Sequence, residues 1–149
     1  MDRRRFSTLL ISLPSLVVAG AAEAARAKPR GSSSEATGAA QMISAIRARY
    51  GHGPVGIDPR MNACAQYQAG SIAQIGWLSH GDFAGRMERL GQDAAWENLA
   101  LGPTTIAGVI QLWRESPGHD RNLLMRDATR IGIARVDAEA PYWALVLAR

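Results

Sequence analysis

The sequence is poor in two reactive residue types: it contains one cysteine, Cys64, and one lysine, Lys28. A single cysteine excludes an internal disulfide, so stability has to come from a hydrophobic core. Cys64 itself lies in a helical pattern and is expected to be a small core residue. The arginines after residue 27 are dispersed rather than clustered, which argues against a nucleic-acid partner. No apolar run reaches the roughly 20 residues that a membrane-spanning helix needs.

Several motifs that carry well-defined chemistry are also absent. The chain has no glycine-rich dinucleotide or phosphate loop, no H-E-x-x-H, no C-x-x-C and no G-x-S-x-G. The common nucleotide fingerprints, the helical zinc-protease motif and the nucleophile elbow are therefore excluded. What is present is a chain of 149 residues with 47% hydrophobic and 20% charged residues. That composition is typical of one globular domain with a buried core.

The first 27 residues have the three parts of an export signal. Arg3, Arg4 and Arg5 precede an apolar run, and the small-residue sites Ala22–Ala24 and Ala25–Ala27 follow it. Two arginines followed by x-Phe resemble a twin-arginine signal. We therefore expect a periplasmic or secreted protein, with cleavage after Ala27 or Ala24. An uncleaved amphipathic anchor is the alternative interpretation. Residues 28–37 are polar and predict a flexible leader, and residues 38–149 the folded domain.

The hydrophobic periodicity of the folded part predicts helices before strands. Apolar residues between Gly38 and Tyr50 form one stripe, from which Arg47 and Arg49 fall away. The remaining expectations are a helix from Asp58-Pro59 to Ile75, a short helix at 83–90, a strand at 95–101, a helix capped by Thr104, one or two helical turns at 119–125, and strands at 130–136 and 142–147. This order predicts an α+β fold in which helices cover a small antiparallel sheet.

Four sequence segments and a terminal hairpin carry a family resemblance. They are Gly56-Ile57-Asp58-Pro59-Arg60-Met61, Leu78-Ser79-His80, Glu97-Asn98-Leu99-Ala100 with Gly102, Trp113 through Ser116-Pro117-Gly118-His119 with Asn122-Leu123-Leu124, and the hairpin Ile131-Gly132-Ile133 with Tyr142-Trp143-Ala144-Leu145. In this order they resemble the CAP superfamily of cysteine-rich secretory, antigen 5 and pathogenesis-related proteins, and most of all its short bacterial members without disulfides. The resemblance covers nearly all of residues 39–148 and implies a three-layer α-β-α sandwich with a cleft.

The resemblance also implies which side chains face that cleft. Carried over position by position, they are His80, Glu97 and His119, which in many family members can hold a divalent metal. Two histidines and a glutamate are a known zinc set that leaves one position open, although imidazole also suits copper and nickel. Eukaryotic members have a further glutamate where this chain has Ser116, while Glu115 lies one residue earlier. The alternative is a structural polar network without metal.

The residues around this set have structural interpretations of their own. Asn98 follows Glu97 on the predicted strand, so the two side chains should point to opposite faces. We interpret Asn98 and Asn122 as amides that brace loops. A serine nucleophile at Ser79 or Ser116 would also need an orienting acid and an oxyanion hole. The four tryptophans, Trp77, Trp96, Trp113 and Trp143, are expected in the core or the cleft wall.

Three functional hypotheses follow from these features. The first is an exported, non-enzymatic domain whose cleft binds a divalent metal, a lipid or a peptide, with a lipid, peptide or envelope component as partner. The second is a metal-dependent hydrolase or peptidase that uses His80, Glu97 and His119, with Glu97 or Glu115 as base. The third is an extracytoplasmic scaffold that meets its partners through an exposed apolar surface.

Overall fold

A computed structural model of the chain describes residues 33–149, so the predicted export signal and residues 28–32 of the predicted leader lie outside the described residues. The first helix begins at Ser33, and Ala36 is buried in the core. The part of the predicted leader from residue 33 to residue 37 is therefore helical instead of flexible. None of the helices in residues 33–149 is long and apolar enough to span a membrane.

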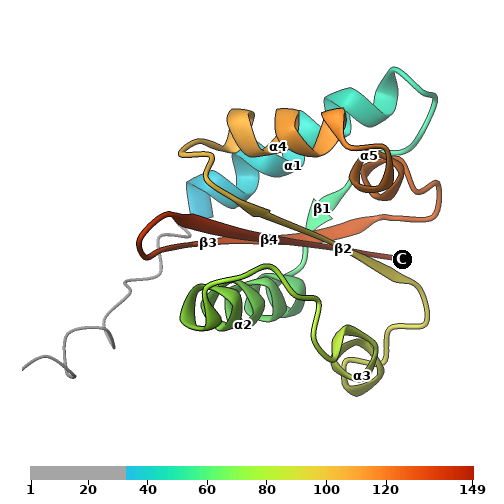
Figure 1. Cartoon of the computed structure of the whole chain (residues 1–149). Helices are drawn as coiled ribbons and strands as arrows, with labels where there is room; N and C mark the ends of the chain where they lie inside the picture. The colour runs from blue at the N-terminus through green and yellow to red at the C-terminus, as the bar shows by residue number, and fades with distance from the viewer. Residues whose placement is uncertain (1–32) are drawn as a thin grey trace, which may run out of the picture.

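The described chain forms three layers around one four-stranded sheet (Figure 1). The elements are α1 (Ser33–Ala48), β1 (Gly56–Ile57), α2 (Pro59–Ile75), α3 (Phe83–Arg89), β2 (Ala95–Leu101), α4 (Ile106–Glu115), α5 (Pro117–Leu123), β3 (Arg130–Asp137) and β4 (Pro141–Ala148). Helices α1, α4 and α5 cover one face of the sheet, while α2 and α3 cover the other. The predicted α-β-α sandwich is therefore confirmed.

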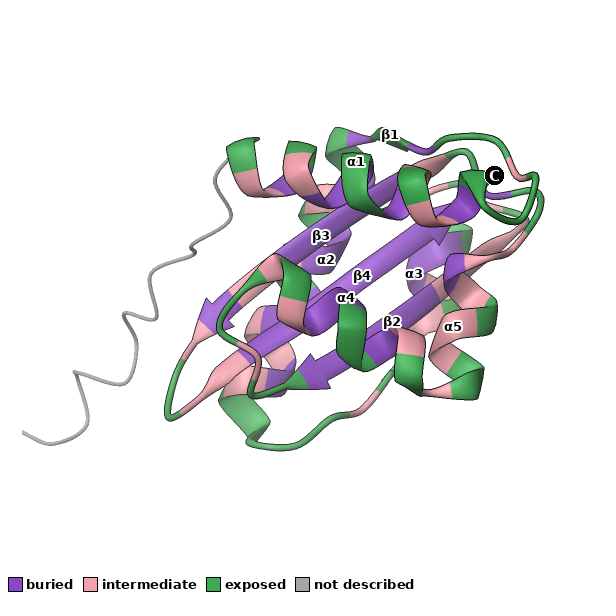
Figure 2. Cartoon of the chain, turned by 90° about the horizontal axis from the view of Figure 1, so that it is seen from above, coloured by how far each residue is buried: buried purple, intermediate pink, exposed green. Residues whose placement is uncertain are grey.

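The sheet has the strand order β1-β3-β4-β2. Strands β2, β4 and β3 pair antiparallel, as predicted, but the two-residue β1 pairs parallel to β3 through Gly56 and Ile57. The sequence analysis did not predict β1. Because β4 lies between β3 and β2 and is covered by helices on both faces, it is buried along nearly its whole length, as Figure 2 shows. Strand β2 is left at one edge of the sheet, where the predicted site residues lie.

Local capping explains where the helices begin and end. Asp58 caps α2 by accepting a hydrogen bond from the backbone nitrogen of Arg60, and Gly76 ends that helix with φ of 81°. Only glycine adopts such a left-handed conformation without strain. Asp82 caps α3 by accepting a hydrogen bond from Gly85 N. The cap of α4 is Thr105, not Thr104, because the Thr105 side chain accepts from Gly108 N. Adjacent threonines are equivalent in sequence, so only the backbone conformation distinguishes them.

The hydrophobic core divides into two parts, one on each face of the sheet. Trp113 and Trp143 are fully buried between the sheet and the α1–α4 layer, and Trp96 is half-buried beside them. Cys64 is buried on the inner face of α2, as predicted, and burial raises the pKa of its thiol. The expectation for Trp77 is wrong: its side chain follows the end of α2 and is 64% exposed.

The Asp58 cap gives the domain a stability that depends on pH. Asp58 is buried, and the hydrogen bond from the Arg60 side chain is the main cause that lowers its pKa from 3.8 to about 2. Arg130 Nη1 also donates to this carboxylate, at 3.0 Å. A carboxyl group whose pKa falls on folding stabilises the folded state above its unfolded pKa, and this contribution is lost as the pH falls through the folded pKa.

We therefore expect Asp58→Asn to lower the free energy of unfolding at pH 7 by about 2 kcal/mol. The asparagine retains the capping oxygen, so the difference from the native protein should shrink between pH 4 and pH 2. Urea denaturation of both proteins across this range measures it. A difference that stays constant with pH would assign the loss to packing instead of charge.

Candidate functional site

The predicted site residues come from three elements that meet at the edge strand β2. His80 lies in the loop between α2 and α3, Glu97 lies on β2, and His119 lies on α5. The alternation of β2 sends Glu97 toward α3 and Asn98 toward α5, because adjacent strand residues face opposite sides of a sheet. Glu97 and Asn98 thus reach the helices on the two sides of this edge strand.

Glu97 is the most enclosed member of the site. Its side chain is only 1% exposed, yet both carboxylate oxygens have partners. The Nδ1 of His80 lies 2.9 Å from Oε1, and Arg86 Nη2 donates to Oε2 at 2.8 Å. Burial raises the pKa of Glu97, while the hydrogen bonds and charges of His80 and Arg86 act in the opposite direction. These two partners therefore offset part of the cost of burying the carboxylate, and its pKa stays raised.

Arg86 is a site residue that the sequence analysis missed. It is buried in α3, and its Nη1 also donates to the backbone oxygen of His80 at 3.2 Å. One signal could have found it. Phe83, Met87 and Leu90 form the inner face of this short helix, and Arg86 falls on the same face at helical spacing. A charge on the core-facing side of a helix requires a buried partner.

His119 belongs to the opposite side of the edge strand. Burial lowers the pKa of His119, and the charge of nearby His80 lowers it further. Its backbone oxygen accepts a hydrogen bond from Asn98 Nδ2 at 3.0 Å. The Nδ2 of Asn122 donates to Asn98 Oδ1 at 2.9 Å and to the Glu97 backbone oxygen at 3.3 Å. The two asparagines thus make the bracing contacts expected of them, and they fix α5 to the outer edge of β2.

The remaining sequence candidates are not drawn into this cluster. Glu115 is exposed on α4, where its Oε1 accepts a hydrogen bond from Gln111 Nε2. Ser116 is the residue before α5 and makes no side-chain capping bond. The hydroxyl of Ser79 accepts from Gly81 N. Within residues 33–149 neither serine is hydrogen-bonded to a histidine, so no nucleophile–base pair is formed there.

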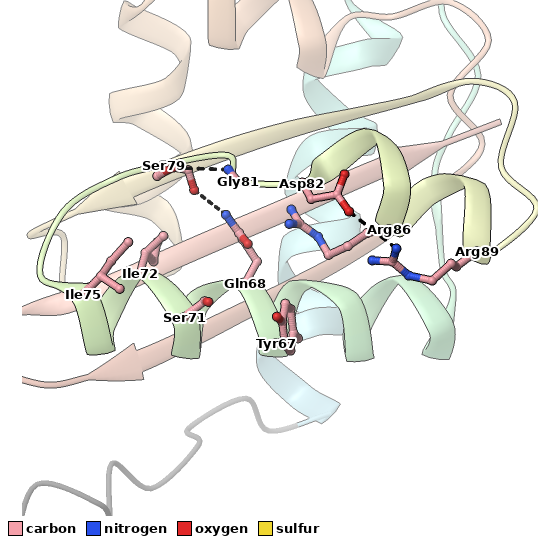
Figure 3. A pocket seen from close by; sticks show the side chains of 10 residues that line it. All are labelled: Tyr67, Gln68, Ser71, Ile72, Ile75, Ser79, Gly81, Asp82, Arg86 and Arg89. Carbon is pink, nitrogen blue, oxygen red and sulfur yellow. Dashed lines mark hydrogen bonds and ion pairs between the residues drawn. The ribbon is translucent and has the colours of Figure 1, made fainter.

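A pocket of about 230 Å³ lies next to the cluster, between α2 and the loop leading into α3 (Figure 3). Its lining residues are Tyr67, Gln68, Ser71, Ile72, Ile75, Ser79, Gly81, Asp82, Arg86 and Arg89. The Nε2 of Gln68 donates to Ser79 O at 2.5 Å and ties the loop to α2. Arg86 is shared between the pocket and the Glu97 cluster, so the two are continuous. The same loop exposes Trp77 and Leu78 to solvent.

The sequence resemblance implies that His80, Glu97 and His119 hold a divalent metal. Among residues 33–149, no three histidine, cysteine, aspartate or glutamate side chains are grouped so that they could hold a metal ion. Glu97 has no carboxylate oxygen without a partner, and one of its partners is a cation. The residues as arranged therefore do not fit a three-ligand metal site.

The fold and the cluster together define a class of protein: a small α-β-α sandwich with a His–Glu pair at an edge strand and a pocket beside it. Residues 40–147 match the family model described as CAP, the cysteine-rich secretory protein family. The chain therefore belongs to the CAP family. No curated protein sequence matches it.

Solved structures share this fold at low sequence identity. An outer surface protein from Borrelia burgdorferi has a TM-score of 0.74 at 17% identity, and the match covers 83% of this chain and 98% of that one. An extracellular protein containing an SCP domain from Bacillus anthracis has a TM-score of 0.69 at 20% identity, over 78% of this chain. This chain covers only 40% of the Bacillus protein. Identities this low show the fold alone.

Proposed function

We propose that this protein is an exported CAP domain that binds a small amphiphilic molecule, with a lipid as the first candidate, and that it is not an enzyme. The observation that carries the proposal is the pocket between α2 and α3, whose wall combines apolar and hydrogen-bonding groups. Small-molecule sites are concave and combine apolar surface with polar groups that orient the ligand, and the wall of this pocket is about as polar as it is apolar. The N-terminal signal pattern supports export, as do the surface and extracellular descriptions of the structural neighbours.

The chemistry of the pocket wall favours a ligand with one apolar and one polar part. Ile75 supplies exposed aliphatic surface from α2 beside the buried Ile72, and Tyr67 adds an aromatic ring with a hydroxyl. Across the pocket, Asp82 and Arg86 supply charged groups, as Figure 3 shows. An apolar chain against α2 and a polar head toward α3 would match both sides. Trp77 and Leu78, in the loop that follows α2, add exposed apolar surface outside the pocket lining.

Ile75→Asp should weaken binding of a fluorescent fatty acid about tenfold, because it places a charge on the apolar wall of the pocket. The full-length protein is purified from its periplasm or medium, and its affinity is measured by probe fluorescence. Native mass spectrometry of the same sample should show a co-purifying small molecule. Leu112→Asp on α4 is the matched control, because Leu112 is 42% exposed and Ile75 is 41% exposed. The control should bind like the native protein.

Two outcomes would contradict this proposal. One is that Ile75→Asp and Leu112→Asp bind the probe equally, which would place binding elsewhere. The other is turnover of peptides or esters that disappears in His80→Ala. The His80–Glu97 pair is the feature that could support such turnover, since an imidazole held at Nδ1 by a carboxylate is the usual arrangement of a general base. Chelator sensitivity of such turnover would indicate the metal-dependent hydrolase.

A further inference from the structure

The carboxylate of Glu97 is the central group of the site, and both of its oxygens are bound by this chain's own side chains. Oε1 lies 2.9 Å from His80 Nδ1, and Oε2 accepts from Arg86 Nη2 at 2.8 Å. A metal ion bound directly by Glu97 would have to displace one of these contacts. Arg86 is the decisive partner, because its guanidinium already brings a positive charge to the oxygen that faces α3.

Arg86 is held in this position by more than its ion pair with Glu97. Its side chain is 9% exposed, and its Nη1 donates to the backbone oxygen of His80 at 3.2 Å. Arg86 thus connects α3, the His80 loop and strand β2. An arginine cannot lose its proton in a protein, so this charge is permanent. Moving it aside would leave a buried cation without a partner, which is strongly unfavourable.

These contacts remove Glu97 from the set of available metal ligands. Structural zinc sites use four protein ligands and catalytic sites use three, and each Zn–O or Zn–N bond is about 2.0–2.2 Å long. With Glu97 occupied, the site offers only the Nε2 of His80 and the imidazole of His119. A dication there would also be repelled by the Arg86 guanidinium.

We propose that Arg86 takes the place at Glu97 that a divalent metal ion would take, so that the site is complete without metal. Glu97 then acts as a positioning residue: it holds the His80 imidazole through Nδ1 and leaves Nε2 directed away from the carboxylate. The Arg86 guanidinium balances the negative charge of the Glu97 carboxylate, so the pair needs no metal ion for this purpose. This inference does not rest on the ligand-binding proposal, because it concerns the contact of Arg86 with Glu97 and not what binds in the pocket that Arg86 also lines.

Removing Arg86 tests the proposal by freeing Oε2. In zinc titrations followed by calorimetry, the native full chain should bind weakly, and Glu97→Gln should bind no more tightly than the native chain. Arg86→Met should bind zinc at least about tenfold more tightly than the native protein, because it gains a carboxylate ligand and loses a repelling charge. Zinc should also raise the melting temperature of Arg86→Met and leave that of the native protein unchanged. The double variant Arg86→Met/Glu97→Gln should lose this gain.

Arg89→Met is the matched control, since Arg89 lies on the same helix but its side chain is 66% exposed. This variant should bind zinc as weakly as the native protein. If Arg86→Met does not fold, the comparison of native and Glu97→Gln proteins still decides. Tight zinc binding by the native protein that Glu97→Gln weakens tenfold or more would overturn the proposal. Unchanged zinc affinity in a folded Arg86→Met would overturn it as well.

Discussion

Replacing Gly132 by alanine is expected to destabilise the domain strongly, although it adds only one methyl group. Gly132 is buried in β3, where α2 crosses the sheet. A β-carbon at this position would overlap the backbone of Met61 and Asn62 in α2. Backbone atoms cannot rotate away as the end of a side chain can, so the helix itself would have to move. Overpacking of this kind costs at least about 3 kcal/mol.

The effect of Gly132→Ala should reach the pocket, because α2 supplies one wall of it. Urea denaturation measures the loss of stability, and probe binding measures the displacement of α2. Gly70→Ala is the control: Gly70 lies inside the same helix, where an added β-carbon meets no other atom. Alanine there should stabilise the protein by about 0.5–1 kcal/mol. Equal stability of the native and Gly132→Ala proteins would show that α2 does not pack this closely on β3.

Replacing Arg47 by methionine is expected to produce the second large loss. Arg47 is fully buried, and it donates to four backbone oxygens with no carboxylate among them. They belong to Gly53, Leu123, Met125 and Ala128, at 2.8–2.9 Å. The guanidinium therefore joins the end of α1 to the segment between α5 and β3. Burial lowers the pKa of Arg47, which reflects the cost of holding this charge away from water.

Methionine has similar length and no donor, so Arg47→Met removes the side-chain donor from four carbonyls, of which Met125 O keeps the hydrogen bond from Ala128 N. We expect the free energy of unfolding to fall by about 3–5 kcal/mol. Arg47→Lys should recover only part of this, because an ammonium group has three donors and lacks the planar fork of arginine. Arg49→Met, at an exposed position two residues further on, should change stability by less than about 0.5 kcal/mol. Equal losses for Arg47→Met and Arg49→Met, measured by urea denaturation, would contradict this role of Arg47.

The candidate site could be predicted in part from local rules. The alternation along β2 correctly separates Glu97 from Asn98, and the bracing role of Asn98 matches its contact with α5. The metal interpretation depended on which residues share a cleft, and no local pattern reports that. Arg86 is the example: eleven residues separate it from Glu97, and only the packing of α3 against β2 brings them together. Three-ligand metal binding stays a prediction, and the Arg86 contact now opposes it.

The sequence by itself determined the elements of this protein. Periodicity and caps located α2, α3 and the strands β2, β3 and β4 to within one or two residues, because these signals act between near neighbours in the chain. The tertiary structure decided which polar residues are buried. The expectation that Arg47 falls away from the stripe of α1 is wrong: Arg47 follows the buried Ile43 by four residues and lies on the same face of the helix. The carbonyls that bind it come from residues 53 and 123–128. Trp77, conversely, is exposed although its side chain is apolar. Burial of a charged group depends on partners that are distant in sequence. Helical spacing places Arg47 and Arg86 on buried faces, but only the folded chain supplies the oxygens that bind them.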